Sequence, residues 1–233
     1  MKTGRLGWLG IYSAVLVCAL PLCSRAVLLG QIDNFQDGTS QNWITGHSSL
    51  GNISTGGPAG AGDRFAQYVS TGTGGIDSRM VFFNNSQWLG NYVGAGITGI
   101  GIDVDNLGSS ALSLRLAFFL DSSDGYVTTT PLALAAHSGW EHTTFSLNAA
   151  NFTTIGSPGA FNTLLSNFSG QLRILSSTSP SLVGDVIAGT LGIDNVQAIP
   201  EPRTIMMVGL GILVVICLRR RRQLEYGVVD QPR

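Results

Sequence analysis

The stretch Leu112-Ser-Leu-Arg-Leu-Ala-Phe118 alternates large apolar side chains with small or polar ones. Side chains on a β-strand point to opposite faces in turn, so positions 112, 114, 116 and 118 share one face. The stretch 100–104 has the same period, with Asp103 between apolar neighbours. Both patterns predict strands that bury one face.

Segments rich in Gly, Ser, Asn and Asp separate several similar stretches, as turns require. Only 161–168 suggests a helix, because Leu164 and Phe168 stand four residues apart. The sequence therefore predicts an all-β fold, an antiparallel β-sandwich that is jelly-roll-like. The further strands predicted are 65–69, 79–83, 126–134, 140–147, 172–175 and 191–196.

Charge is scarce and unevenly distributed along the 233 residues. Only 12% of the residues are charged, and Lys2 is the single lysine. Residues 31–199 hold four arginines and eleven acidic residues, a net charge of −7. This segment lacks the basic side chains that displace counterions from phosphates, so we expect no nucleic-acid partner. The 44% of hydrophobic residues is enough to bury a core.

The N-terminus is typical of a secretory signal peptide. Lys2 and Arg5 precede an apolar stretch at 6–22, and Ser24 and Ala26 are small residues at the −3 and −1 positions of a signal-peptidase site. We therefore predict a signal helix over 1–26, cleaved after Ala26. An uncleaved membrane anchor is the alternative.

The C-terminus combines a proline motif, an apolar run and a basic cluster. The motif consists of Pro200, Glu201 and Pro202, and the apolar run covers 204–218. As a helix, this run would span about 22 Å, against about 30 Å of bilayer hydrocarbon. The basic cluster would hold its end in the cytoplasm and leave the acidic segment outside. It consists of Arg219, Arg220, Arg221 and Arg222, followed by a short polar tail at 223–233. An ordinary single-pass anchor is the alternative.

These residues, with Gly209-Leu210-Gly211 inside the apolar run, resemble the PEP-CTERM sorting signal of Gram-negative bacteria that make exopolysaccharides. The resemblance implies export across the inner membrane, transient anchoring there and cleavage near Pro-Glu-Pro by an exosortase. It assigns 200–222 to the sorting signal and 27–199 to the exported domain. Arg203 and the tail depart from the usual pattern.

The exported segment also resembles domains that often accompany this signal, and more distantly the carbohydrate-binding-module and laminin-G-like sandwiches. The stretches that carry this likeness are Asp33-Asn-Phe-Gln-Asp-Gly-Thr, Gly56-Gly-Pro-Ala-Gly-Ala-Gly-Asp63, Leu112-Ser-Leu-Arg-Leu-Ala-Phe118, Ser138-Gly-Trp-Glu-His142, Leu172-Arg-Ile-Leu-Ser-Ser177 and Leu191-Gly-Ile-Asp-Asn-Val196.

In such jelly rolls, a structural calcium often ties the first strand to the last. The resemblance thus makes Asp33 and Asp194 candidate ligands, and Asp63 could add an oxygen. The alternative is that these acids cap turns.

Aromatic side chains in polar loops could stack on sugar rings. Trp88 and Tyr92 lie in a Gly/Asn-rich connection, and Trp43 is a third candidate. Loop anchoring is the alternative for Trp88. Trp140 opens a predicted strand, and we expect it in the core.

Other motifs carry no chemistry. Gly94-Ala-Gly96-Ile-Thr-Gly99 matches a dinucleotide fingerprint, but a predicted strand rather than a helix follows it. The three histidines lack zinc-site spacing. All three cysteines lie in the end segments.

We therefore predict a non-enzymatic, exosortase-sorted protein of the cell envelope or of an exopolysaccharide or biofilm matrix, with affinity for polysaccharide. The alternatives are a secreted glycan-active enzyme, using Glu141 and an aspartate, and a purely structural adhesin. Glu141 is the only glutamate between 31 and 199, whereas a glycosidase needs two carboxyl groups across the scissile bond.

Overall fold

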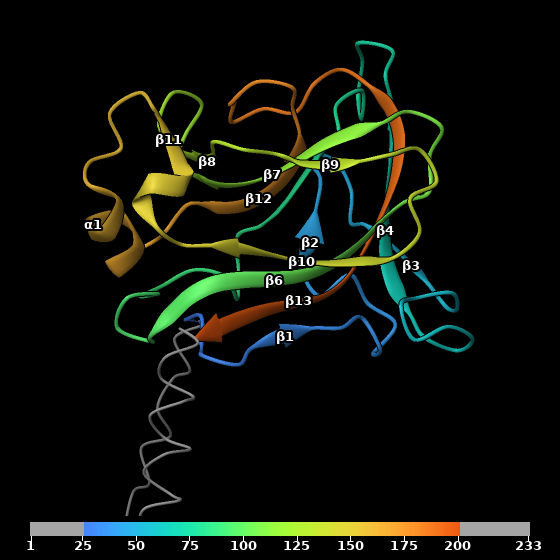
Figure 1. Ribbon diagram of the computed structural model, residues 1–233, viewed down its shortest axis with the longest axis horizontal. Helices are drawn as coiled ribbons and strands as arrows, with labels where there is room; N and C mark the ends of the chain where they lie inside the picture. The colour runs from blue at the N-terminus through green and yellow to red at the C-terminus, as the bar shows by residue number, and fades with distance from the viewer. Residues whose placement is uncertain (1–25, 201–233) are drawn as a thin grey trace, which may run out of the picture.

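The computed structural model describes residues 26–200, which form two antiparallel β-sheets packed face to face (Figure 1). The predicted all-β sandwich is confirmed. The predicted signal helix, Glu201, Pro202, the C-terminal hydrophobic helix and Arg219 to Arg222 lie outside the described residues. Within 26–200, no helix has the length and apolar character needed to cross a membrane.

Sheet A has its long strands at the centre and a short strand, β1, beside them. Its order is β10 (Glu141–Ser146), β6 (Ile97–Asn106), β13 (Ala188–Pro200), β4 (Phe65–Thr71) and β3 (Gly51–Ile53), with β1 (Ile32–Asp33) paired to β13.

Sheet B lies opposite, and the chain crosses repeatedly between the two sheets. Its order is β11 (Phe152–Ile155), β8 (Gly125–Thr128), β7 (Leu112–Phe119), β12 (Gln171–Ser176), β5 (Val81–Asn84) and β2 (Trp43–Ile44), with β9 (Leu132–Leu134) paired to β7. The short helix α1 (Phe161–Ser166) and a 3-10 turn (Ala149–Asn151) lie in the connections.

The core fills the space between the sheets, as the alternating patterns predict. Leu114, Leu116 and Phe118 on β7 are fully buried, and so are Ile102 and Val104 on β6. Burial of one such side chain contributes about 1.5–3 kcal/mol. The alternation at 112–118 and 100–104 therefore sets the two inner faces.

The predicted strand at 126–134 is wrong as a single element. It is split into β8 and β9, which pair with different parts of β7. Pro131 stands in the break and has no N–H for a sheet ladder. The buried Arg115 donates hydrogen bonds to the carbonyl oxygens of Thr128 and Thr129 at 2.6 and 2.7 Å. These bonds replace the ladder at that point.

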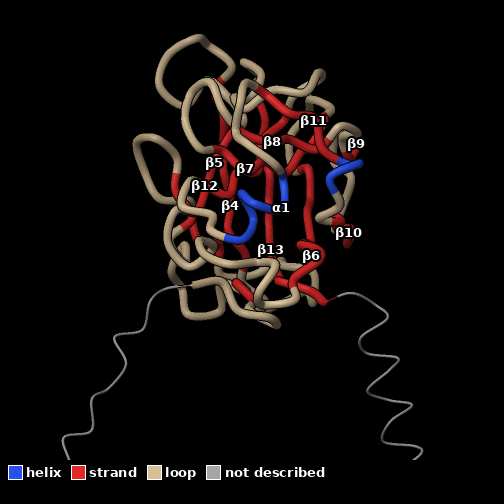
Figure 2. Tube along the Cα trace, turned by 90° about the vertical axis from the view of Figure 1, so that its left-hand side faces the viewer, coloured by secondary structure: helices blue, strands red, loops and turns tan. Residues whose placement is uncertain are grey.

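Both ends of the described chain leave from the same end of the sandwich (Figure 2). The backbone N–H of Gly30 donates to the carbonyl oxygen of Ala198, and the N–H of Ala198 donates to that of Gln31. Pro200 itself is paired with Ile97 in the ladder between β13 and β6. The Pro-Glu-Pro motif therefore begins inside the folded sheet.

Candidate functional site

The three aromatic side chains predicted to contact glycan lie in the core. Trp43, Trp88 and Tyr92 have no exposed surface. Trp43 packs against Trp88 with ring centroids 6.4 Å apart, and the Tyr92 hydroxyl donates to the Trp88 carbonyl oxygen at 2.6 Å. A buried ring offers no face to a sugar, so the alternative holds and these residues anchor loops.

Both indoles are held by the carboxylate of Asp33. Asp33 Oδ2 accepts hydrogen bonds from Trp43 Nε1 at 2.8 Å, Trp88 Nε1 at 2.6 Å and Gln87 Nε2 at 3.0 Å. Burial raises the pKa of Asp33, and these three bonds oppose the rise. Asp33 therefore joins β1 to β2 and to the 85–96 connection.

The predicted calcium ligands do not come together around one ion. Asp33 points to the indoles, whereas Asp194 pairs across sheet A with Asp103. Asp63 accepts hydrogen bonds from Gln36 Nε2 and from the Ala59 N–H, each at 2.7 Å. Among residues 26–200, no three His, Cys, Asp or Glu side chains are placed to hold a metal ion together. Asp33 therefore lies apart from the other two candidates, whereas Asp63 lies close enough to Asp194 for its charge to raise the pKa of Asp194.

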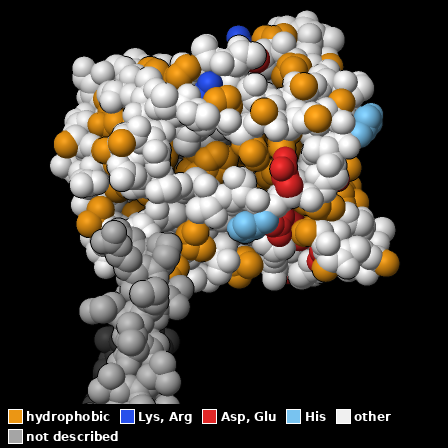
Figure 3. Space-filling model, in the orientation of Figure 1, with side chains coloured by type: hydrophobic (Ala, Val, Ile, Leu, Met, Phe, Trp, Pro, Cys, Tyr) orange, Lys and Arg blue, Asp and Glu red, His pale blue; other side chains and the backbone are white. Residues whose placement is uncertain are grey.

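Asp194 instead belongs to a polar row on the outer face of sheet A. The register aligns Asp194 of β13 with Asp103 of β6, and Asp103 with His142 of β10. His142 Nδ1 lies 2.7 Å from Asp103 Oδ1, and Asn195 Nδ2 donates to Asp103 Oδ2 at 2.8 Å. Figure 3 shows a histidine beside acidic side chains on this face.

Burial determines the protonation of Asp194 in this row. Asp194 is 1% exposed, and burial raises its pKa to about 7, with further contributions from the nearby charges of Asp63 and Asp103. Asn195 lies in a β-bulge with a φ of +48°, a left-handed conformation that asparagine tolerates. The bulge brings the Asn195 amide between the two carboxyl groups.

Trp140 lies on this outer face, so the expectation that it belongs to the core is wrong. It is half-buried, with its ring edge-to-face against Phe65 at 5.2 Å, and its Nε1 donates to the Gly56 carbonyl oxygen. A Cβ at Gly192 would lie 3.1 Å from the Trp140 ring. Glycine at 192 thus lets the indole lie across β13.

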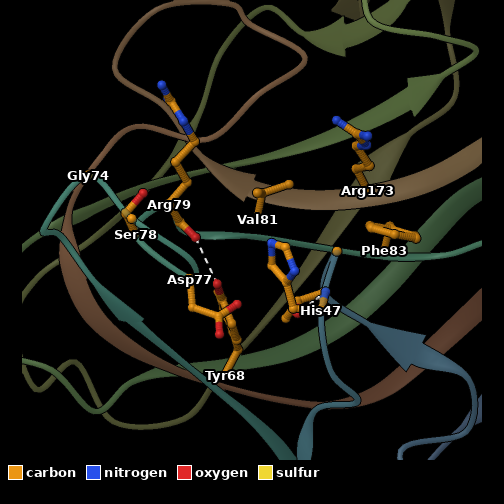
Figure 4. Close-up of a pocket in the computed structure, with 12 residues that line it drawn as sticks. His47, Tyr68, Gly74, Asp77, Ser78, Arg79, Val81, Phe83 and Arg173 are labelled. Atoms are coloured by element: carbon orange, nitrogen blue, oxygen red, sulfur yellow. Dashed lines mark hydrogen bonds between the residues drawn. The ribbon is translucent and has the colours of Figure 1, made fainter.

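A pocket lies where β4 approaches β5, at the edge of the sandwich (Figure 4). It has a volume of about 350 Å³, within the usual range for ligand sites. Figure 4 shows the His47 imidazole standing in it below Val81, with Tyr68 and Asp77 beside it. The lining includes Thr45, His47, Tyr68, Asp77, Ser78, Arg79, Val81, Phe83 and Arg173.

Two of its aromatic side chains have defined roles. The Tyr68 hydroxyl donates to the Arg79 carbonyl oxygen at 3.0 Å, and burial raises the pKa of Tyr68 to about 12, so this hydroxyl keeps its proton. Phe83 is half-buried. The Arg173 guanidinium lies over it at 5.6 Å and over Phe119 at 3.3 Å.

The two arginines that line the pocket, Arg79 and Arg173, donate hydrogen bonds to neutral oxygen atoms. Arg79 donates to the Gly184 carbonyl oxygen at 2.6 Å, and Arg173 donates to Gln171 Oε1 and to the Leu182 carbonyl oxygen. Burial lowers the pKa of Arg173 to about 10, so it stays charged at neutral pH. Within 26–200, the single contact at salt-bridge distance between a basic and an acidic side chain is that of His142 with Asp103. The pocket thus offers aromatic surface, an imidazole and a carboxylate together.

The sequence-based predictions missed this pocket. Its residues come from four separate segments, around 45–47, 68, 74–83 and 173. Gly74-Gly75 before Asp77 marks a loop, but nothing in the linear pattern links it to His47. The rejection of the fingerprint at 94–99 is confirmed, since residues 94–96 form a turn and strand β6, not a helix, begins at Ile97.

Residues 198–222 match the PEP-CTERM protein-sorting motif, which confirms the resemblance noted in the sequence. Of its residues, Ala198 to Pro200 lie in β13. No curated protein matches the chain.

Among solved structures, the fold is similar to part of an exo-beta-agarase, with a TM-score of 0.51 and 12% identity. That alignment covers 74% of this chain and 26% of the agarase, so the chain spans about a quarter of its length. A family 11 carbohydrate-binding module of the cellulase Lic26A-Cel5E of Clostridium thermocellum aligns over 75% of this chain and 96% of the module, with a TM-score of 0.45 and 12% identity. Such low identities concern the fold alone.

The fold and the motif define a class: an exported β-sandwich protein with a C-terminal sorting signal. The signal is of the PEP-CTERM type. It implies export, processing by an exosortase and transient anchoring in the membrane during processing.

Proposed function

We propose that this protein is a non-enzymatic polysaccharide-binding protein, sorted by exosortase to the cell surface or to an exopolysaccharide or biofilm matrix. The pocket of Figure 4 is the observation that carries this proposal. Phe83 supplies an aromatic surface for the C–H face of a sugar, while His47 and Asp77 supply a donor and an acceptor for hydroxyl groups.

The placement of the carboxyl groups supports a binding role over hydrolysis. Glu141 pairs with Val104 and His142 pairs with Asp103. Paired residues share a face and neighbours alternate, so Glu141 and Asp103 project to opposite sides of sheet A. Asp194, on the same face as Asp103, is 1% exposed and out of reach of a glycosidic oxygen. Neither Asp103 nor Asp194 is therefore placed to flank a common bond with Glu141.

The test is binding of the purified chain to a panel of bacterial exopolysaccharides, followed by titration calorimetry with the best ligand. We expect Phe83→Leu and His47→Gln each to weaken binding about tenfold, equivalent to about 1.4 kcal/mol. Phe145→Leu and His137→Gln are the controls, because Phe145 lies on β10 of sheet A and neither residue lines the pocket. Equal loss in the controls would count against this pocket.

Hydrolysis is measured in the same samples by release of reducing ends. The expected rate is that of the buffer alone, for the parent chain and for Glu141→Gln. Turnover abolished by Glu141→Gln would establish the enzyme alternative. An absence of binding to every polysaccharide would instead favour a structural adhesin.

A further inference from the structure

The end of the sandwich from which both chain ends leave is built differently from the rest of the domain. It consists of residues 26–32, 89–99, 144–150 and 197–200. Several contacts hold these segments together: the Val27 N–H donates to the Leu89 carbonyl oxygen, Pro200 pairs with Ile97, and a hollow is lined by Leu147 and Pro200. We call this region the exit end.

The exit end exposes large apolar side chains next to the points where the chain leaves. Leu28 is 66% exposed, Leu29 48%, Ile32 44% and Val93 51%. Single exposed apolar residues are ordinary, but neighbouring ones mark contact surfaces. Figure 3 shows hydrophobic side chains beside the point where the grey segments leave.

The exit end also lacks charge at its surface. The segments 26–32, 89–99, 144–150 and 197–200 contain no Asp, Glu, Lys or Arg, although residues 31–199 carry a net charge of −7. Hydroxyl and amide side chains take their place, among them Thr144, Ser146 and Asn148 around the hollow. The acidic residues nearest to it are Asp33, which is buried, and Asp37, which lines a second hollow together with Leu28.

The sorting segment places the exit end close to a bilayer. Only residues 201–203 separate Pro200 from the apolar run at 204–218. Three residues reach about 10 Å at most. As a helix, this run would span about 22 Å, less than the hydrocarbon core of about 30 Å, and such a mismatch would draw the flanking domain inward.

We propose that the exit end rests on the outer surface of the lipid bilayer while the sorting segment is in the membrane, with Leu28, Leu29 and Val93 in the headgroup layer. Burial of apolar side chains in that layer removes them from water and favours binding. The uncharged surface avoids repulsion between acidic side chains and anionic lipid. Hydroxyl and amide groups around the hollow bond to headgroup oxygens. The pocket of Figure 4 shares no lining residue with the hollow and stays open to polysaccharide.

The experiment uses residues 27–233, the chain that the predicted signal cleavage leaves, with Cys217 replaced by serine, reconstituted in vesicles of phosphatidylethanolamine and phosphatidylglycerol. Leu28→Cys carries an environment-sensitive fluorophore, and Ile76→Cys is the matched control. Ile76 is 68% exposed, so both sites are equally open in the free domain. It lies in the loop after β4, away from the exit end.

We expect the fluorophore at position 28 to shift to shorter wavelength and to be quenched by lipids labelled near the headgroup, about 5–10 Å deep. The fluorophore at position 76 should do neither. In a second arm, Val93→Cys repeats the test on a separate loop, and Leu29→Asp should reduce quenching at position 28.

Equal, unquenched emission at 28 and 76 would overturn the proposal. A shift at position 28 that appears only when exosortase is present in the vesicles would overturn it too, because the occupant would then be the enzyme. Circular dichroism of each variant checks the fold, so that lost quenching is not mistaken for unfolding.

Discussion

Asp33 in β1 and Asp194 in β13 are both buried aspartates, but the cost of burying the carboxyl group is offset differently in each. Asp33 gathers three neutral N–H donors on one oxygen, from Trp43, Trp88 and Gln87. Asp194 has only Asn195 as a donor, and it lies near two other acids, Asp63 and Asp103. With a pKa of about 7, Asp194 keeps its proton below that pH, whereas Asp33 accepts hydrogen bonds from neutral donors.

The difference shows how a small sandwich tolerates buried carboxyl groups without cations. Every arginine in 26–200 donates to backbone carbonyl or amide oxygen atoms rather than to an acid. A buried carboxyl group must then be satisfied by neutral donors or be neutralised by a proton. The first solution holds elements together, and the second makes stability depend on pH.

The largest expected effect comes from removing the acceptor at position 33. Asp33→Leu leaves two buried indole N–H groups and the Gln87 amide without their partner, at about 1–3 kcal/mol each. We expect the free energy of unfolding to fall by about 4 kcal/mol in denaturant titrations. Asp33→Asn keeps one acceptor oxygen and should cost much less. Equal losses of unfolding free energy in the two variants would mean that the hydrogen bonds to Asp33 do not stabilise the fold.

Asp194 should make stability depend on pH with the opposite sign to an ordinary paired aspartate. Its pKa is raised from an ordinary value of 3.8 to about 7 in the folded chain. The folded chain therefore holds a proton that the unfolded chain releases, and stability falls as pH rises from about 4 to about 7. Each pKa unit is worth roughly 1.4 kcal/mol, and solvent at the outer face screens part of the total. Asp194→Asn should therefore raise stability at pH 8 by about 3 kcal/mol.

The measurement is thermal and denaturant unfolding at pH 4, 6 and 8. Asp121→Asn serves as the control, because Asp121 accepts hydrogen bonds from Ser123 and its pKa is lowered. Its contribution to stability is present above pH 4 and is lost as pH falls. A pH profile unchanged by Asp194→Asn would refute the buried proton.

The smallest expected effect is that of calcium. Since Asp33 is already bound by N–H donors and faces away from Asp194, millimolar calcium should change the melting temperature by less than about 1 °C relative to chelator. Scanning calorimetry with and without calcium checks this. A rise of several degrees would reveal a site built from other oxygen atoms.

The sequence by itself determined the sandwich and the sorting signal. Alternation at 112–118 and 100–104 fixes which face of each strand is apolar, and that local property is enough to assign strands and their inner faces. The Pro-Glu-Pro motif, apolar run and arginine cluster are likewise linear, because they are read along the chain.

The location of the candidate site residues, in the core or at the surface, was decided only by the tertiary structure. Whether Trp88 is a loop residue for sugar or a core residue depends on Asp33, 55 positions away. The short strands β1, β2, β3 and β11 were missed, because their pairing comes from neighbours distant in sequence.

Whether two aspartates share an ion depends on the face to which each side chain turns. The register of β13 against β6 sets Asp194 beside Asp103 and not beside Asp33. Such contacts join segments far apart along the chain. Their energies therefore depend on packing and register, which local propensity does not encode.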